Sequence, residues 1–512
     1  MSAHPGTGEH GTGHGVAASD ERPLRHPGLI LAFLCVAGFM TFLDVSIVNV
    51  ALPTIEHELG MSESSLQYLV TAYATVLGGF LLLGGRLADT FGRRRLLRSG
   101  LLLFAASSLL AGAAQNAGTL VTARGLQGLG AAFIAPAALS LLTSTFPQGP
   151  ERNRALGVWG ALTGLAAVAG VILGGLLTEG PGWRWIFFVN VPIGLVAAAL
   201  APRIVPESRA GQRSRTFDTA GAVVLTATMV LLIFTLGETV EAGWTSARTL
   251  AGLAAVAVLL PAFLAIERRA EAPLIPLTVF RLPVLRAANL TAVLLFGTLV
   301  TLFFFASLFL QQVLGYSPIE AGLAYVPLAV ITAVGAGVSA QLVGRTAAKP
   351  VLLTGLALTA CGMLLLSRLP AYASYPGEVL PAFLVVGLGL GLSFVPVQVA
   401  AFIGVRKEDS GLAAGLIDTS QEAGGALGVA IAATLAFSRI PELTREADGD
   451  PVLLRAARAS VFQDAFLVGA CFAVAALVIA LVLLPMLRPS EHAEAEAAEA
   501  ETEADGAAVA AG

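Results

Sequence analysis

The stretch GGRLADTFGRRRLL, residues 84–97, places one aspartate and a run of three arginines between two long apolar runs. The chain of 512 residues is otherwise 56% hydrophobic and only 12% charged, whereas soluble domains carry about a quarter charged residues. Runs of roughly 20 apolar residues, enough to cross a hydrocarbon core about 30 Å thick, recur along almost the whole length. This pattern predicts an all-α polytopic membrane protein and excludes a single-pass anchor.

Fourteen membrane spans are predicted between the charged or Pro/Gly-rich breaks. They lie near residues 28–52, 66–87, 96–115, 119–145, 155–178, 184–202, 218–237, 248–266, 285–311, 319–342, 350–368, 380–404, 411–436 and 464–487.

The arginines and lysines test this count independently, because short cytoplasmic loops carry them in excess. One alternating set of loops holds Arg93, Arg94, Arg95, Arg98, Arg152, Arg154, Arg203, Arg209, Arg213, Arg215, Arg268, Arg269, Arg281, Arg286, Arg345, Lys349, Arg406 and Lys407. The other set is poor in them, apart from Arg184, Arg248, Arg368 and a loop at 437–463 in which both signs are mixed. The even count and the alternation predict that both termini are cytoplasmic.

An internal duplication is indicated by two similar loops. The loop after the second span is matched, in decayed form, by SAQLVGRTAAKPVLL (339–353) after the tenth span. Duplicated halves mark many transporter folds. The predicted organisation is a disordered cytoplasmic N-terminal tail (1–27), a six-helix half (28–205), an inserted two-helix linker (206–270), a second six-helix half (271–488) and an acidic, disordered cytoplasmic C-terminal tail (489–512).

Four motifs resemble those of the major facilitator superfamily and, within it, the fourteen-helix drug:proton antiporters. The first is the 84–97 loop, in which Thr90 stands where a basic residue is usual. The others are FLDVSIVNVALPTI (42–55), ARGLQGLGAAFIAPAALSLL (123–142) and GWRWIFFVNVPIG (182–194). The second half matches more loosely, through LFLQQVLGYSPIEAGLAYVP (308–327) and AGLIDTSQEAGGALGVA (414–430). The resemblance implies a major facilitator fold that exports a drug, antibiotic or metabolite in exchange for protons.

The fifth span departs from the resemblance. Val171 stands where the antiporter motif carries proline, in GVILGG (170–175), although Gly170, Gly174 and Gly175 still permit close helix packing. A proton-linked importer or a uniporter on the same fold is therefore a second hypothesis. A channel or membrane enzyme is a third, against which stand the absence of a filter-like loop and of clustered His or Cys in the spans.

The resemblance gives the 84–97 loop, through Gly85, Asp89, Gly92, Arg93 and Arg94, the function of a conformational latch between the halves when the cavity faces outward. A carboxylate is stabilised near a helix N-terminus, and an arginine offers a forked bond to a carboxylate. The start of the thirteenth span, at Ser410-Gly411, is the predicted docking point. The alternative is that the loop only sets topology.

Charges inside a span are costly, about 2.5–3.5 kcal/mol on insertion scales, and usually functional. Asp44 and Arg124 lie at similar depths in the first and fourth spans, where Arg124 would set the pKa of Asp44 and couple protonation to transport. The alternative is a permanent structural ion pair. Asp418 and Glu422, one helical turn apart, form a second possible proton or substrate site. The alternative is that both carboxylates are simply solvated near the cytoplasmic end of the span.

Polar residues in other spans complete the set of candidates. Asn289, Gln311, Gln312 and Gln398 either line a cavity or form interhelical hydrogen bonds. No G-x-x-x-x-G-K-[ST] loop is present, which argues against direct use of ATP. The prediction is a monomeric transporter of the bacterial inner membrane that is not an enzyme. Its partners are a small molecule, protons and the lipid bilayer, with no cofactor, metal or nucleic acid.

Overall fold

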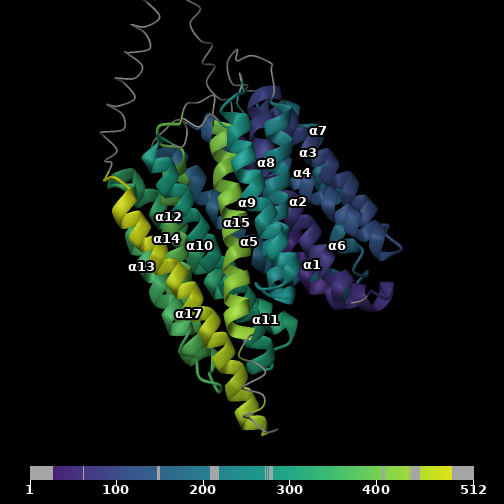
Figure 1. Ribbon diagram of the computed structural model, residues 1–512, viewed down its shortest axis with the longest axis vertical. Helices are drawn as coiled ribbons and strands as arrows, with labels where there is room; N and C mark the ends of the chain where they lie inside the picture. Colours follow the sequence, from purple (N-terminus) through teal and green to yellow (C-terminus); the bar gives the residue numbers. More distant parts are fainter. Residues whose placement is uncertain are drawn as a thin grey trace, which may run out of the picture.

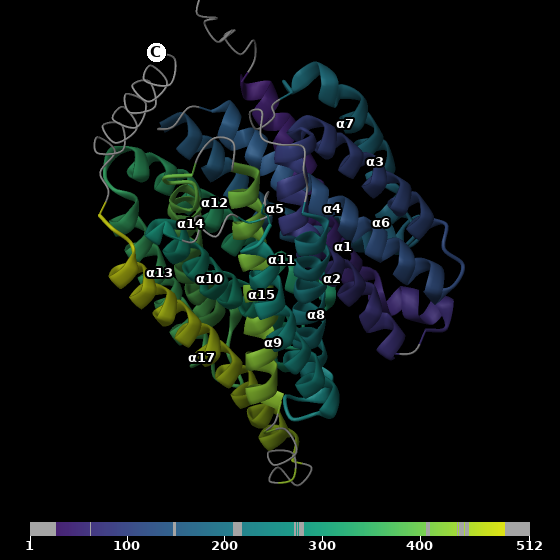
Figure 2. The same cartoon turned by 45° about the horizontal axis from the view of Figure 1, so that its top comes forward.

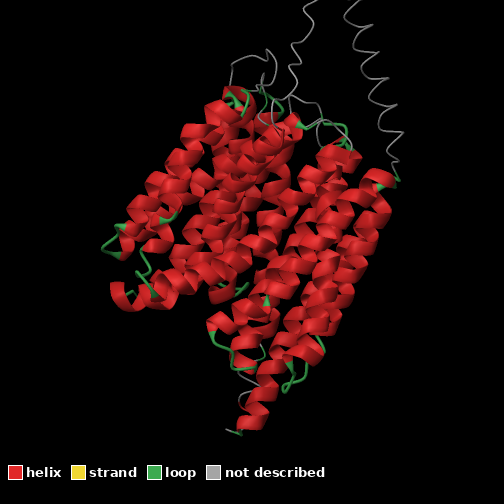
Figure 3. Ribbon diagram, turned by 180° about the vertical axis from the view of Figure 1, so that it is seen from behind, coloured by secondary structure: helices red, strands yellow, loops and turns green. Residues whose placement is uncertain are grey.

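The apolar runs of the sequence form helices because a helix satisfies its backbone hydrogen bonds internally, as the hydrocarbon core requires. The computed structural model describes residues 27–61, 63–146, 150–207, 218–270, 281–405, 410–437 and 450–486, with residues 273, 275, 439 and 445. Long helices lie side by side throughout these ranges (Figure 1, Figure 3). The prediction of an all-α chain is confirmed.

The helices are α1 (Pro27–Leu59), α2 (Glu63–Phe91), α3 (Arg93–Gly112), α4 (Ala117–Thr145), α5 (Pro150–Glu179), α6 (Trp185–Phe188), α7 (Asn190–Ile204), α8 (Thr219–Ala242), α9 (Ala247–Glu267), α10 (Pro283–Leu308), η2 (Phe309–Val313), α11 (Pro318–Ala324), α12 (Val326–Arg345), α13 (Ala348–Leu366), η3 (Tyr375–Val379), α14 (Leu380–Ala401), α15 (Ser410–Phe437) and α17 (Pro451–Leu483).

Every predicted span falls on these helices, although the sixth is divided between α6 and α7, the ninth between α10 and η2, and the tenth between α11 and α12. Among the described residues, 12 helical stretches are long and apolar enough to cross a membrane. Two long helices, α5 with 30 residues and α15 with 28, are not among them. The membrane-spanning character of the chain is clear, whereas the count of fourteen stays a prediction.

Helices α1 to α7 pack on one another as a group. Helix α1 lies on α5, α2 and α3 lie on α4, and α7 lies on α3. Glycines bring the backbones close: a Cβ on Gly84 would lie 2.2 Å from the Ala132 carbonyl oxygen, and a Cβ on Gly128 would lie 2.5 Å from that of Tyr73. Small residues at such contacts are the usual means of tight helix packing in membranes.

A second group runs from α10 to α17. Helix α10 packs on α15 and α17, and α14 packs on α12 and α13. Here too glycines allow the contacts, since a Cβ on Gly391 would lie 2.2 Å from the Thr332 carbonyl oxygen and one on Gly424 would lie 2.1 Å from that of Val293. The two groups meet where α15 packs on α2 and α12 packs on α5.

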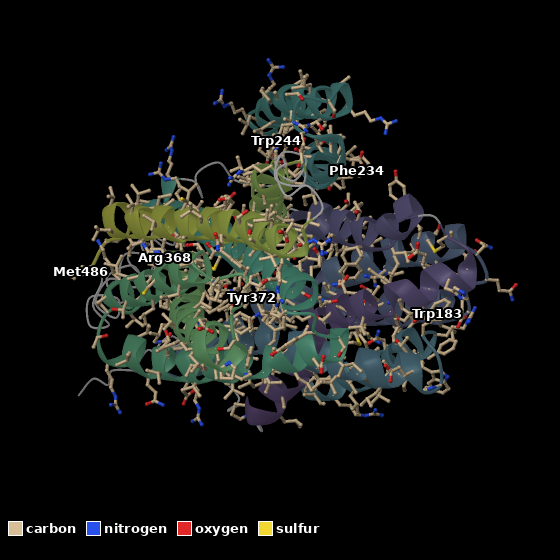
Figure 4. The ribbon with its side chains drawn as sticks, turned by 90° about the horizontal axis from the view of Figure 1, so that it is seen from below. Trp183, Phe234, Trp244, Arg368, Tyr372 and Met486 are labelled. Carbon is tan, nitrogen blue, oxygen red and sulfur yellow. The ribbon has the colours of Figure 1, made fainter. Side chains whose placement is uncertain are left out.

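Helices α8 and α9 pair with each other outside these two groups (Figure 4). Helix α8 contacts both α2 and α15, so that it covers the line along which the groups meet. Beyond its end, Trp244 Nε1 donates a hydrogen bond of 2.8 Å to Thr434 Oγ1 of α15. The inserted pair is thus attached to both groups.

Helix α17 differs from the sequence prediction, because it begins at Pro451 and not near residue 464. Asp450 caps it by accepting a 2.8 Å hydrogen bond from the Val452 N–H, and proline suits the first helical turn. Further along, Gln463 Nε2 donates to the Leu369 carbonyl oxygen at 2.7 Å. Polar residues that read as a loop therefore form the first turns of a helix that projects from the bundle (Figure 1).

The start of α1 and the end of α17 lie at the same end of the bundle (Figure 2). The predicted tails, 1–27 and 489–512, lie outside the described residues except for Pro27. The predicted domain boundaries stay a prediction.

Candidate functional site

Asp44 of α1 and Arg124 of α4 form an ion pair inside the first group of helices. Their side chains are 0% and 2% exposed, respectively, and Arg124 Nη1 donates to Asp44 Oδ2. The sequence singled out both residues and their similar depth. The structure brings them into direct contact.

Two amide side chains that the sequence reasoning missed complete the surroundings of Asp44. Gln127 Nε2 donates to Asp44 Oδ1 at 3.2 Å, and Asn190 Nδ2 donates to the same oxygen at 3.0 Å. Gln127 lies three residues after Arg124, hence on the same helical face, which is a signal that was available. Asn190 begins α7, and its sequence context gave no indication that it reaches α1.

Arg124 has further partners besides the carboxylate. Its Nε donates to the Leu69 carbonyl oxygen at 3.2 Å and its Nη1 donates to Gln127 Oε1 at 3.0 Å. Its guanidinium carbon lies 4.4 Å from the ring centroid of Tyr73, within the range of a cation–π contact. The positive charge is therefore held by α2 and α4 as well as by Asp44.

The glycines of the fifth span position α1 beside this site. A Cβ on Gly170 would lie 2.4 Å from Ser46 Cβ, and one on Gly174 would lie 3.0 Å from the Ile47 carbonyl oxygen. Both contacts are on the turn of α1 that follows Asp44. Gly175 is different, since its Cβ would meet Ile319 of α11 at an ordinary 3.4 Å.

Asp418 and Glu422 lie on α15, where it faces α2 and α8. Both residues are half-buried, and Asp418 Oδ2 has no hydrogen-bond partner among the described residues. Glu422 is close to α2, because a Cβ on Gly78 would lie 3.4 Å from Glu422 Cβ. Two carboxyl groups thus lie near the meeting line of the two helix groups.

The polar candidates of the second half lie on three different elements, α10, η2 and α14. Asn289 Oδ1 accepts a hydrogen bond of 2.8 Å from Ser420 Oγ, which joins α10 to α15. Gln311 Nε2 of η2 donates to Ser307 Oγ, one turn earlier in α10, at 2.9 Å, and Gln312 is exposed. Gln398 of α14 is buried, and its Oε1 has no partner in the part of the chain that the structure describes.

Asp89 lies in the last turn of α2, because the predicted 84–97 loop is helical except at Gly92, and its carboxylate contacts the start of α15. Asp89 Oδ1 accepts from the Gly411 N–H at 3.1 Å, and Asp89 Oδ2 accepts from the Leu412 N–H at 3.0 Å. Free N–H groups at a helix start and the helix dipole both favour an anion there. Arg93 supports the same carboxylate, with Nη2 and Nε at 2.9 and 3.1 Å from Oδ1.

The two arginines of the latch motif point to different partners. Arg93 is 2% exposed and contacts Asp89. Arg94 Nη1 donates to the Val205 carbonyl oxygen at 3.1 Å, and Arg94 Nε lies 3.5 Å from a carboxylate oxygen of Glu207. Arg94 therefore acts within the first group of helices, on the residues that follow α7. Between α2 and α3, Gly92 has a φ of 107°, which a residue with a side chain rarely adopts.

Gly85 explains how α2 and α15 come so close. A Cβ on Gly85 would lie 2.2 Å from the Gly411 carbonyl oxygen, and one on Gly411 would lie 2.5 Å from Asp89 Oδ1. Both positions lack room for any side chain. Ser140 of α4 and Ser410 of α15 add a hydroxyl contact of 3.2 Å beside this point.

At the other end of α1, Glu58 joins α1 to the start of α6. Its Oε2 accepts from Trp183 Nε1 at 2.9 Å and from Arg184 Nη1 at 3.0 Å. These two donors hold the pKa of the Glu58 carboxyl below its usual value. The Trp183 side chain is buried, so its N–H needs this acceptor (Figure 4 labels Trp183). Within the described ranges, no three His, Cys, Asp or Glu side chains gather as metal ligands.

The chain is similar to transporters of known family along most of its length. It is 37% identical to the puromycin resistance protein pur8 of Streptomyces alboniger, over 93% of each chain. It is 38% identical to the cephamycin export protein CmcT of Amycolatopsis lactamdurans, over 90% of this chain and 93% of that one. The fold is similar to that of the proton:xylose symporter XylE, with a TM-score of 0.63 and 16% identity over 90% of this chain and 96% of the other.

The family model of the major facilitator superfamily matches residues 34–429. That match runs from α1 to α15 and includes the ion pair, the α15 carboxylates and the contact at Asp89. With its apolar helices and bacterial relatives, the chain is a multi-pass protein of the bacterial inner membrane, as predicted. The chain belongs to the major facilitator superfamily.

Proposed function

We propose that the protein exports a small organic compound, such as a drug, antibiotic or metabolite, in exchange for protons by alternating access. The observation that carries this proposal is the buried Asp44–Arg124 pair, because charges placed inside a membrane protein usually serve ion or proton movement. The names of the relatives, a puromycin resistance protein and a cephamycin exporter, support the export of such compounds.

The contacts of Arg124 make Asp44 suitable as a proton carrier. Neutralising one member of an isolated buried ion pair leaves the other charge uncompensated, which is strongly unfavourable. Arg124 keeps the Leu69 carbonyl, the Gln127 oxygen and the face of Tyr73 when Asp44 takes up a proton. Asp44 can therefore exist in both forms without leaving Arg124 isolated.

Asp418, Glu422, Asn289 and Gln398 form the second candidate set for protons or substrate. Asp418 and Gln398 favour such a function, because each holds a buried oxygen without a partner among the described residues. Asn289 is already engaged with Ser420 and serves interhelical contact as well. We propose Asp44 as the first candidate for the proton site and the carboxylates of α15 as the second.

The Asp89 contact is the proposed latch. It joins the end of α2 to the start of α15 across the two helix groups, through two backbone N–H donors and Arg93. In this arrangement the groups are held together at the cytoplasmic end. The contact thus stabilises the outward-facing state in the proposed cycle.

The proposed topology is fourteen spans with both termini in the cytoplasm, in two six-helix halves (28–205 and 271–488) with an inserted pair (206–270). The shared end at which α1 begins and α17 ends supports an even count. Helices α5 and α15 pack inside the bundle and would complete the fourteen. The protein functions as a monomer in this proposal. Cysteine labelling from outside tests the topology: Ser246→Cys should react and Ser99→Cys should not.

Transport into everted membrane vesicles tests the export hypothesis. A panel of toxic compounds is first screened for growth protection in an efflux-deficient host, with puromycin included because of the relative that carries its name. An exchanger should then accumulate the protected compound in vesicles that are acidic inside, and a protonophore should abolish the accumulation. A proton-linked importer would lose compound from the lumen under the same gradient, and a uniporter would ignore the gradient.

A further inference from the structure

Asn190 holds an unused hydrogen-bond acceptor next to Asp44. Its side chain is 1% exposed. The Nδ2 group donates to Asp44 Oδ1 at 3.0 Å and, more weakly, to the Ile186 carbonyl oxygen at 3.5 Å. The amide oxygen of Asn190 is buried and has no donor among the described residues. Buried polar atoms are nearly always paired, so each exception requires an explanation.

Gln127 provides a direct comparison at the same carboxylate. Its Nε2 donates to Asp44 Oδ1 at 3.2 Å and to Ser108 Oγ at 2.8 Å, while its Oε1 accepts from Arg124 at 3.0 Å. Rotating this amide would break the contact with Arg124. Of the two amides beside Asp44, only that of Asn190 has an oxygen without a partner among the described residues.

The protonated and ionised forms of Asp44 require opposite partners. A carboxylate only accepts hydrogen bonds, whereas a carboxylic acid must donate one. Arg124, Gln127 and Asn190 all donate to Asp44 as the structure stands, so the site is arranged for the carboxylate. A proton placed on Oδ1 would face the donating Nδ2 group of Asn190 and would need an acceptor in its place.

We propose that Asn190 is a positioning residue that serves both forms of Asp44 by rotation of its amide. In the ionised form Nδ2 donates, as observed. When Asp44 Oδ1 takes up a proton from water, a half-turn of the amide places the oxygen where Nδ2 now lies, 3.0 Å from Asp44 Oδ1, to accept the new O–H. The proton on Asp44 Oδ1 makes this one hydrogen bond, to the amide oxygen of Asn190. It is later released to water on the opposite side of the membrane. The half-turn gives up the 3.5 Å contact with the Ile186 carbonyl oxygen, and it moves the NH2 group to the position that the amide oxygen now occupies.

The inference rests on the proposed function, namely proton exchange at Asp44. Among the described side chains, the charged or titratable groups that face Asp44 from neighbouring helices are Arg124 of α4 and Tyr73 of α2. The hydroxyl of Tyr73 donates to the Thr41 carbonyl oxygen at 3.4 Å. Helices α3 and α7 contribute the uncharged Ser108 and Asn190, and α5 contributes Gly170 behind α1. An uncharged amide can donate to the carboxylate and accept from the carboxylic acid, so the Asn190 amide is suited to bind both forms of Asp44.

Infrared difference spectra of the full-length protein, acidic minus neutral, test the inference. The wild type should show a protonated-carboxyl band that is lost in Asp44→Asn. In Asn190→Leu the band should persist at higher wavenumber, because the acid O–H loses its acceptor. Asn190→Ser should bring it back towards the wild-type position, since a hydroxyl both donates and accepts. Gln127→Leu, which removes a donor to Asp44 but no acceptor for its proton, should displace the band less than Asn190→Leu does.

Three outcomes would overturn the proposal. An Asp44 band that stays in place in Asn190→Leu means that the proton is held by another group. An equal displacement in Gln127→Leu means that the shift reports general repacking. A band that persists in Asp44→Asn removes Asp44 as the proton site, and this failure of the proposed function is recognisable before any Asn190 variant is made.

A second measurement on the wild-type chain does not depend on the folding of Asn190→Leu. With ¹³C-labelled asparagine, the amide carbonyl band of Asn190 should shift on acidification, because its oxygen gains a hydrogen bond. The shifting component should be absent from Asn190→Ser. A spectrum without a pH-dependent amide component assignable to Asn190 would contradict the amide rotation.

Discussion

Asp89 Oδ2 accepts a hydrogen bond of 3.0 Å from the backbone N–H of Leu412, a residue 323 positions away in the sequence. This contact and its neighbour at Gly411 join the end of α2 to the start of α15. Because the two helices belong to different groups, any movement that separates the groups at this end must break both hydrogen bonds. The contact is therefore placed where it can bias the transport cycle.

The first prediction concerns the charge of Asp89. Asp89→Asn keeps the shape but removes the anion from the start of α15, where such an interaction contributes about 1–2 kcal/mol in a buried geometry. The outward-facing population should fall roughly 5- to 30-fold relative to the inward-facing one. Accessibility labelling of the outer cavity measures this change. Arg95→Gln is the control, because Arg95 has a largely exposed side chain and pairs with Glu207 rather than with Asp89. Normal labelling and normal transport in Asp89→Asn would show that the contact does not bias the cycle and that residues 84–97 only set the membrane topology.

The second prediction concerns the close approach of α2 and α15. Gly85→Ala would place a Cβ 2.2 Å from the Gly411 carbonyl oxygen, so the helices must separate. Overpacking of this kind costs about 1–3 kcal/mol, and we expect it to disfavour the latched state in the same labelling assay. Gly337→Ala in α12 is the matched control, because its Cβ would meet nothing within 4 Å. Equal effects of the two substitutions would show that helix propensity, and not the contact, is responsible.

The third prediction concerns proton coupling at Asp44. Asp44→Asn should imitate the protonated form, so that gradient-driven efflux is lost while substrate binding or passive exchange survives. Arg124→Ala should shift the pH dependence of efflux. The measurement is proton release on substrate addition in detergent, compared between the wild type and Asp44→Asn. Equal proton release from both proteins would show that Asp44 is not the proton site, and Asp418 and Glu422 would then be the next candidates.

A purely structural ion pair gives a different result for the same residues. Removing one partner of a buried pair costs about 3–5 kcal/mol, because the other charge is left uncompensated. Either single substitution would then lower the yield of folded protein, and the double variant Asp44→Asn with Arg124→Ala would recover it. Fluorescence-detected gel filtration of the three variants separates this account from coupling.

The fourth prediction concerns pH and the Glu58 contact. The folded-state pKa of Glu58 lies below its ordinary value of 4.5 because Trp183 and Arg184 donate to the carboxylate. A depressed folded-state pKa means that the stabilisation is fully present above the unfolded-state pKa and is lost as the pH falls through the folded-state value. Glu58→Gln should therefore lower the melting temperature at pH 7, and this deficit should shrink as the pH falls below 4.5 and through the folded-state pKa. A deficit that stays constant with pH would show that the carboxylate charge is not involved.

The positions of the helices follow from the sequence, because the length of an apolar run and the cost of a charge within it are local properties. Asp44, Arg124, Asp418, Glu422 and Asp89 stand out from their apolar surroundings for this reason. The start of α17 shows the limit of the same argument. Its first turns are polar enough to read as a loop, and the cap at Asp450 and the contact of Gln463 with Leu369 decide that they are helical.

Which side chains meet was decided only by the tertiary structure, because it depends on the rotation of each helix and on its neighbours. Arg93 and Arg94 are adjacent in sequence, yet one holds Asp89 and the other the residues after α7. Asn190 lies 146 positions from Asp44 and reaches it only because α7 starts beside α1. The sequence by itself determined where the long apolar helices lie and which residues have charges that needed an explanation, and packing of the helices determined the partners of those residues.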